Sequence, residues 1–367
     1  MFQPLRILLF ATMATLATSG AGHEDLRLPV PASSPPHAGD RNPLSVMTYN
    51  VKGLPWPIAM GRDEALDRIA ERLVAMRRAD RQPHIILLQE TFSAEAASLA
   101  TRAGYRHVAK GPQASLRTPA AVEDGDGQYL QQARWDRGEH VGKPLDSGLM
   151  ILSDYPIVGA ERMAFPDVAC AGFDCLANKG VLVAHLDVPG MGRVSIVNAH
   201  LNARKAAMVP IARSQRAYSR QVGLMAGFVA RHVPRGQTLI LGGDMNIGKD
   251  GERQRAFFDA FARAGLPFVT AGLSGARQAL DRGLLANSAT RHDLIGAVRH
   301  GKDWLFARSG DGAALPVLAA ETPFGTEAQG EPLSDHVGYA IHYAGAGRAA
   351  HEALHLAAGD PARVGRR

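Results

Sequence analysis

The sequence predicts an α/β fold in which two mixed β-sheets are covered by helices. Strand-like and helix-like segments alternate along most of the chain, which is typical of parallel βαβ units. Residues 179–200 instead predict two consecutive strands joined by a short turn, which adds an antiparallel hairpin. The 367 residues have an ordinary globular composition, 46% hydrophobic and 21% charged, enough for one large core or two smaller ones.

The N-terminal residues have the pattern of an export signal. Arg6 precedes the apolar stretch 7–17, and the small residues at 18–22 offer a cleavage region. The stretch is too short for a transmembrane span, which needs about 20 apolar residues. We therefore expect a signal peptide over 1–22, a Pro-rich linker over 23–43, and a secreted or periplasmic protein without a transmembrane segment.

The expected elements follow in order along the chain. Residues 62–79 predict an amphipathic helix, because apolar residues recur on one face with charges opposite. Two further helices are expected at 211–232 and 252–264. Apolar or alternating patterns predict strands at 44–51, 84–90, 147–153, 179–188, 193–200, 237–244, 303–308 and 336–343.

Two segments depart from this regularity. Residues 111–145 combine Pro, Gly, Asp and Arg in a long insertion, which we interpret either as a substrate-facing flap or as a disordered surface loop. Residues 345–367 are expected to form a tail that does not pack on the core, with a short terminal helix as the alternative. Residues 44–344 would then form a single catalytic domain.

Five segments place polar side chains at or near a predicted strand end. The most informative is Gly242-Gly243-Asp244-Met245-Asn246, which follows an apolar run, and we expect its glycines to turn the backbone sharply. The other segments carry Asn50, Gln89 with Glu90, His200 with Asn202, and Ser334-Asp335-His336. A plain turn could explain one such segment, but five repeats of one design favour a shared site.

In their order and rough spacing, these five segments resemble the motifs of the endonuclease/exonuclease/phosphatase superfamily, the DNase I-like metallophosphodiesterases, over about residues 44–344. The resemblance implies a four-layer α/β/β/α sandwich. Two further segments, Asp146 to Ile157 and Asn178-Lys179-Gly180, resemble the secreted bacterial sphingomyelinase C branch.

The resemblance also implies roles for the residues that handle metal and water. Glu90 with Asn50 offers the hard oxygen donors that suit Mg²⁺ or Mn²⁺. His336 is expected to be the general base, tuned by the adjacent Asp335 or by another carboxylate. Asp244 would position the attacking water.

Other residues are expected to face the substrate. Asn246 would donate to the phosphorane oxygens, and His200 would bind phosphate or assist the leaving oxygen, with Asn202 beside it. Lys179 could meet phosphate charge, although a solvated lysine is the alternative.

Two aspartates also match family positions. Asp303 opens a late strand, but Lys302 replaces the apolar residue usual before it. Asp146 matches a position near the leaving group or the metal, with a simple turn residue as the alternative.

The two cysteines are expected to pair. Four residues separate Cys170 from Cys175, and in an oxidising compartment Gly172 would let this short loop close into a disulfide. Two free thiols are the alternative.

These observations predict an exported, monomeric, Mg²⁺-dependent phosphodiesterase of the sphingomyelinase or phospholipase C type, acting on a membrane lipid headgroup through peripheral contact. One feature differs from the sphingomyelinase branch. A membrane-attacking member is expected to have an aromatic-rich hairpin before the last motif, whereas residues 316–333 contain Phe324 as their only aromatic residue. The net charge of +6 keeps open a secreted nuclease that acts on nucleic acid. A catalytically silent binding protein is the third possibility.

Overall fold

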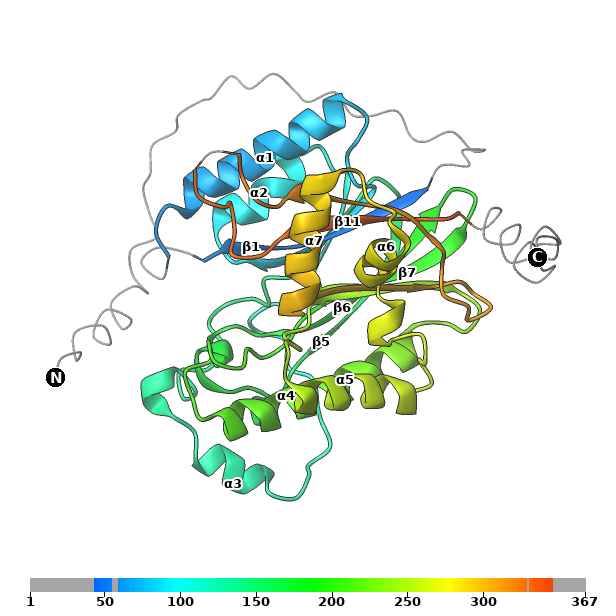
Figure 1. The fold of residues 1–367 in the computed structure, drawn as a ribbon. Coiled ribbons are helices and arrows are strands. Elements are labelled where there is room, and N and C mark those ends of the chain that lie inside the picture. Colours follow the sequence, from blue (N-terminus) through cyan, green and yellow to red (C-terminus); the bar gives the residue numbers. More distant parts are fainter. Residues whose placement is uncertain (1–42, 55–58, 329, 346–367) are drawn as a thin grey trace, which may run out of the picture.

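Two β-sheets lie face to face, and helices cover their outer faces (Figure 1). The structure is a computed structural model that describes residues 43–54, 59–328 and 330–345. The expected signal peptide, nearly all of the linker and nearly all of the C-terminal tail lie outside the described residues. The arrangement confirms the four-layer α/β/β/α sandwich.

The first sheet has the strand order β10-β11-β1-β2-β4-β3, and only β1 and β2 are paired in parallel among its described strands. Helices α1 and α2 cover its outer face (Figure 1). The bounds are β1 (Leu44–Gly53), α1 (Arg62–Arg78), β2 (Ile85–Thr91), α2 (Ala94–Arg102), β3 (His107–Lys110), β4 (Met150–Ser153), β10 (Val317–Phe324) and β11 (Gly338–Tyr343).

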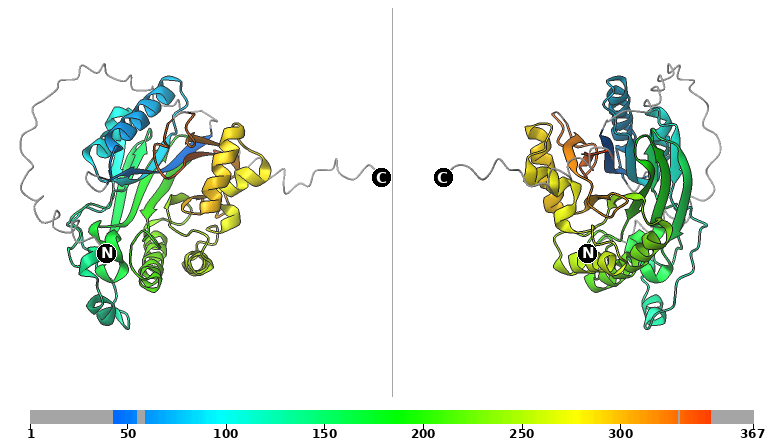
Figure 2. Two further views of the ribbon diagram at one scale, coloured as in Figure 1. Left: turned by 60° about the vertical axis from the view of Figure 1, so that its left-hand side comes forward. Right: turned by 90° about the vertical axis from the view of Figure 1, so that its right-hand side faces the viewer.

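The second sheet has the order β5-β6-β7-β8-β9, with β7 and β8 in parallel. Helices α4 and α5 cover its outer face, and α6 and α7 lie against the edge strands β9 and β10 of the two sheets (Figure 2). The bounds are β5 (Ile157–Ala164), β6 (Gly180–Val188), β7 (Gly192–His200), α4 (Ile211–His232), β8 (Thr238–Asp244), α5 (Gly251–Arg263), α6 (Gly275–Arg282), α7 (Ser288–His300) and β9 (Asp303–Arg308).

Three apolar layers hold the sandwich together, which explains why the central strands are apolar on both faces. In β2, Ile85 and Leu87 point between the sheets, whereas Ile86 and Leu88 pack beneath α1 and α2. In β8, Ile240 lies between the sheets, and its two neighbours in sequence face α4 and α5. Side chains alternate along a strand, so both faces must be apolar when both are covered.

The expected helices and strands are present, with shifts of at most a few residues at their ends. Elements that the sequence analysis did not predict are β3, β5, β10, α2, α6 and α7, together with the short helix α3 (Asp126–Gln131). The notable strand among these is β10, which lies at the edge of its sheet and contains a proline.

The expected sharp turn at Gly242 and Gly243 was wrong, because both residues lie inside β8. A Cβ atom on Gly243 would lie 2.1 Å from the carbonyl oxygen of Ala199 on β7. One on Gly242 would lie 2.5 Å from a methyl carbon of Leu305 on β9. The glycines therefore allow neighbouring strands and side chains to approach closely, and the turn follows Asp244.

The insertion 111–145 is anchored to the helical layer of the second sheet. The Arg213 side chain of α4 forms a buried ion pair with Glu139 at 2.8 Å, and the Tyr129 hydroxyl donates to the Cys170 carbonyl at 2.6 Å. The expected disulfide between Cys170 and Cys175 is present. Among the described residues, no helix combines the length and the hydrophobicity needed to cross a membrane.

Candidate active site

Three polar side chains lie side by side at one edge of the second sheet. His200 ends β7 and Asp244 ends β8, and these residues are paired directly because the two strands run in parallel. Asp303 begins β9, which runs antiparallel, so its first residue is paired with Asp244. Residues directly opposite each other share one face of a sheet, so all three side chains belong to one rung.

The first sheet supplies the residues that face His200, Asp244 and Asp303 across the site. Asn50 and Glu90 lie toward the C-terminal ends of the parallel strands β1 and β2, and therefore at the same edge. His336 lies just before β11, and the hydroxyl of Ser334 donates to the Asn50 carbonyl at 2.7 Å. This hydrogen bond ties the loop that carries His336 to β1.

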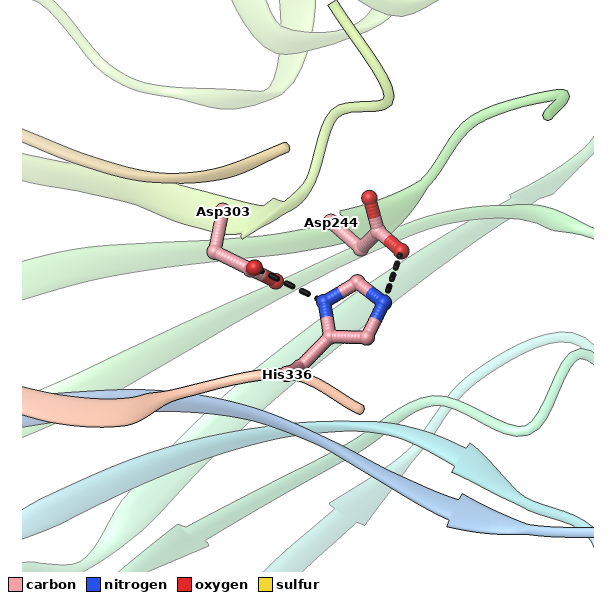
Figure 3. A group of neighbouring side chains, drawn as sticks. All are labelled: Asp244, Asp303 and His336. Atoms are coloured by element: carbon pink, nitrogen blue, oxygen red, sulfur yellow. Dashed lines mark hydrogen bonds and ion pairs between the residues drawn. The ribbon is translucent and has the colours of Figure 1, made fainter. Parts of the chain in front are cut away.

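Asp244 is at the centre of the cluster. Its Oδ2 atom accepts a hydrogen bond from Asn50 Nδ2 at 3.1 Å. The same oxygen lies 3.5 Å from His200 Nε2. It also lies 3.7 Å from His336 Nε2 (Figure 3). Its Oδ1 atom accepts from the backbone N–H of Asn246 at 3.1 Å. One buried carboxylate therefore faces both histidines.

His336 is held by a second carboxylate. Its Nδ1 atom lies 2.7 Å from Asp303 Oδ2, which leaves Nε2 directed toward Asp244 (Figure 3). Burial by itself lowers the pKa of His336, but the carboxylates of Asp303 and Asp244 outweigh it and raise the pKa to about 10. In this arrangement, without a bound cation, His336 carries a proton at neutral pH.

His200 has the opposite surroundings. Lys179 Nζ lies 3.0 Å from His200 Nε2 and 2.9 Å from Asp174 Oδ1. Burial and the neighbouring ammonium group lower the pKa of His200 to about 3. The imidazole is therefore neutral and accepts from Lys179 at Nε2, while its buried Nδ1 has no hydrogen-bond partner among the described residues.

Glu90 has the surroundings expected of a cation ligand. Burial raises the pKa of its carboxyl, and its Oε1 atom accepts from Asn50 Nδ2 at 2.9 Å. The Asn50 amide nitrogen thus lies between the carboxylates of Glu90 and Asp244, where positive charge is favoured. Glu90 also has a left-handed backbone with φ of 58°, a conformation that costs energy and recurs at functional sites.

These donors fit a hard divalent cation. Mg²⁺ takes one or two protein oxygen ligands and keeps several waters. Asn50 would have to turn its amide to offer Oδ1, because that oxygen now accepts from the Lys52 N–H at 3.0 Å. Ligand atoms of Asp244, Asp303 and His336 also lie within 4.8 Å of one another. Because Asp303 engages Nδ1 of His336, this imidazole could offer a cation only its Nε2 atom. Glu90 and Asn50 are residues that could hold such a cation through oxygen atoms alone.

Asp335 or another carboxylate was expected beside the imidazole, and the contact is not made by Asp335. Its side chain is 56% exposed and lies 3.7 Å from Lys52 Nζ. Asp335 and His336 lie in the bend before β11, where Asp335 faces solvent and His336 faces the site. Asp303, which we expected to face substrate, takes the position beside the imidazole.

Asp146 and Asn202 lie beside the cluster. Asp146 is exposed, accepts from the Ala114 N–H at 2.7 Å, and lines a pocket of about 340 Å³ that also includes Thr91, next to Glu90. Asn202 is fully buried, and both ends of its amide bond to backbone atoms, those of Ala171 and Ala203, each at 2.9 Å. Asn202 therefore shapes the loops that follow β7.

Arg253 of α5 supports the site, although the sequence analysis did not single it out. It is fully buried, and its Nη1 atom donates to the carbonyl oxygens of Asn202 and Asn246 at 2.8 Å. Its guanidinium also lies over the Tyr218 ring, 4.1 Å from the centroid. An arginine in an amphipathic helix ordinarily indicates a solvated face, so the sequence carried no signal for this contact.

A buried amide pair joins the two sheets beneath the site. Gln89 Nε2 donates to Asn198 Oδ1 at 2.9 Å, and both side chains are fully buried. Asn198 Nδ2 donates in turn to the carbonyl oxygens of Leu88 and Met150 at 2.9 Å. Since buried amides need such partners, the pair fixes how the sheets face each other. In the sequence, the indication of this pair was an amide near the end of each of two apolar strands.

Two packed mixed sheets that bring carboxylates, amides and histidines together at one edge have the architecture of DNase I-like hydrolases. The chain belongs to the Endonuclease/Exonuclease/phosphatase family, whose model matches residues 47–336.

The individual relatives have low sequence identity to this chain. A sphingomyelinase of Mycobacterium bovis is 24% identical over 321 residues, which are 86% of this chain and 56% of that protein. The chain thus spans little more than half of this curated relative. A crystal structure of Staphylococcus aureus beta toxin with bound magnesium ions has a TM-score of 0.54 and 16% identity, covering 82% of this chain and 99% of that one. Sphingomyelinase C of Streptomyces griseocarneus has a TM-score of 0.51 and 19% identity, with the same coverage.

Proposed function

We propose that this protein is an exported, Mg²⁺-dependent phosphodiesterase that releases a phosphocholine-like headgroup from a membrane lipid. The observation that carries the proposal is the position of Asp244 Oδ2, within 3.7 Å of both histidines and hydrogen-bonded to Asn50. The similarity to a curated sphingomyelinase supports a lipid substrate. The N-terminal export pattern and the disulfide support an oxidising compartment.

Glu90 and Asn50 are the residues that would hold Mg²⁺, or Mn²⁺, through oxygen donors. A bound cation would neutralise charge on the phosphodiester and, through its field, favour the neutral form of His336.

His336 would act as the general base. Asp303 holds Nδ1, so the Nε2 atom is the one that takes the proton of the attacking water. Asp244 lies next to this Nε2 and would hold the water in line with the phosphorus atom.

The other side of Asp244 would bind the anionic ester. The ammonium group of Lys179 would turn from His200 Nε2 to a phosphate oxygen, and the amide of Asn246 would donate to the charge that develops there. His200 is neutral in this structure, so it would act as a hydrogen-bonding group beside Lys179.

The test is Mg²⁺-dependent release of phosphocholine from sphingomyelin vesicles by the purified protein, with Asp244→Ala as the inactive control. Release at the level of the control refutes the lipid assignment. Mg²⁺-dependent nicking of plasmid DNA that requires His336, with lipid untouched, would instead establish a nuclease. Inactivity on lipid, on DNA and on bis(4-nitrophenyl) phosphate would contradict the enzyme assignment altogether.

A further inference from the structure

Exposed apolar side chains are concentrated in one corner of the molecule. In the described part of the chain, eleven large hydrophobic residues are exposed, and six of them lie in the insertion or in two loops close to it. These six are Val122, Leu130, Trp135, Val141, Phe173 and Met208. Single exposed hydrophobic residues need no explanation, but a concentration of them beside a candidate site does.

Four of these residues come from loops in direct contact, and we call them the apolar rim: Trp135, Val141, Phe173 and Met208. Their side chains are 69%, 62%, 43% and 58% exposed, respectively. Arg137 connects the loops, because its Nε atom donates to the Met208 carbonyl at 3.0 Å and its guanidinium lies over the Phe173 ring.

One loop of the rim is linked to the candidate active site through Asp174 and Lys179. Phe173 is followed by Asp174, which pairs with Lys179 at 2.9 Å and accepts from the Ala203 N–H at 2.5 Å. Lys179 lies in turn 3.0 Å from His200 Nε2. The segments that present Phe173 and Met208 are therefore held next to the residues that we propose bind the phosphodiester.

Basic side chains accompany the rim. Arg134 and Arg137 share the carboxylate of Asp136 at 2.8 and 3.4 Å, so these three residues keep one net positive charge. Lys205 lies exposed on the same loop as Met208. Aromatic and aliphatic side chains flanked by cations suit the interface of a bilayer, where rings enter the headgroup layer and cations meet lipid phosphates.

We propose that the apolar rim docks this protein on the surface of a phosphocholine-lipid bilayer. The inference rests on the proposed function, because it assumes that the substrate of the neighbouring site lies in the membrane. The rim would insert Trp135, Phe173 and Met208 among the headgroups and so bring Lys179 to the depth of the lipid phosphate. It takes the place of the aromatic-rich hairpin that residues 316–333 do not provide.

The test compares the wild-type protein with the triple variant Trp135→Ser, Phe173→Ser, Met208→Ser. Ile295→Ser is the matched control, because Ile295 on α7 is 45% exposed and lies outside these loops. Binding to sphingomyelin and phosphatidylcholine vesicles is measured by co-sedimentation, and catalysis by hydrolysis of bis(4-nitrophenyl) phosphate. We expect the triple variant to bind vesicles at least about tenfold more weakly, with unchanged hydrolysis of the soluble ester.

The outcomes separate this inference from the proposed function. If the triple variant binds vesicles as tightly as the wild type, the apolar rim does not dock the protein on the bilayer, whether or not the lipid is hydrolysed. Rim-dependent vesicle binding without any release of phosphocholine supports the rim and refutes the lipid phosphodiesterase. If sedimentation velocity shows a dimer that only the triple variant loses, with vesicle binding intact, the rim is an interface between two copies and the bilayer proposal is wrong.

Discussion

The two histidines of the candidate site face the same oxygen of Asp244 but have opposite charge states. His336 lies between two carboxylates, which raise its pKa to about 10, whereas His200 lies beside an ammonium group and has a pKa of about 3. One side of Asp244 therefore holds a proton and the other side excludes one. Two imidazoles that face one carboxylate oxygen thus differ in charge, because the other charged neighbours of each ring set its pKa.

The largest expected effect is that of His336→Gln, compared with the same replacement of His200. His336→Gln removes the proposed general base and should lower kcat/KM for bis(4-nitrophenyl) phosphate by about 10³-fold. His200→Gln replaces one neutral hydrogen-bonding group by another, so we expect a loss of about tenfold. Initial rates with saturating Mg²⁺ measure both losses. Equal losses would show that the two histidines do not have the different roles assigned to them.

The next effect concerns the cation. Glu90→Gln removes the only charged ligand that we assign to Mg²⁺ among the described residues. The Mg²⁺ concentration for half-maximal activity should therefore rise by at least about 10- to 100-fold, the loss typical of removing a mere outer-shell partner. Glu321→Gln is the matched control, since this partly buried carboxylate of β10 pairs with His342. If the Mg²⁺ dependence is unchanged in Glu90→Gln, the cation does not bind at Glu90.

The two histidines should also make opposite contributions to the pH dependence of stability in the metal-free protein. Folding raises the pKa of His336 from 6.5 to about 10, so its stabilisation is full below pH 6.5 and is lost as the pH rises toward 10. Folding lowers the pKa of His200 from 6.5 to about 3, so stability is lost as the pH falls from 6.5 toward 3. Each slope is on the order of 1 kcal/mol per pH unit.

Urea unfolding in EDTA between about pH 4 and pH 10 measures these slopes. His336→Gln should flatten the alkaline limb of the stability curve, and His200→Gln should flatten the acidic limb. A variant that flattens the opposite limb would show that the two charge states are assigned the wrong way round.

The smallest expected effect is that of Asp335→Asn. Because Asp335 is exposed and pairs only with Lys52 among the described residues, the change should alter kcat/KM by less than about twofold. Asp303→Asn, which removes the charge beside His336, should cause a far larger loss. If Asp335→Asn is the more damaging of the two, Asp303 is not the residue that holds the imidazole.

Much of the fold could be predicted from the sequence because its central strands are apolar on both faces. The run 85–88 and the run 238–241 can be buried only between two layers, and the polar residues that follow them must then lie at a sheet edge. By contrast, β10 is an edge strand with a proline and half-buried residues, so its pattern is weak. The packing of α6 and α7 depends on both sheets and has no local signature.

The site was predictable in its members but not in its pairings. That Asp244, Asn246 and His336 belong together followed from repeated strand-end motifs. Which carboxylate would hold His336 did not, because Asp303 reaches it only after β9 is placed beside β8. Local sequence favoured Asp335, the neighbour in the chain, whereas strand order decides the neighbour in space.

The shared rung of His200, Asp244 and Asp303 has a consequence for how the chain can vary in length. Because side chains alternate along a strand, adding or deleting one residue within β8 would swing the Asp244 carboxylate toward α4 and α5. Such a change would remove the acid from both histidines in a single step, with no partly working intermediate. Insertions and deletions in functional variants should therefore be confined to the loops and absent from the three strands.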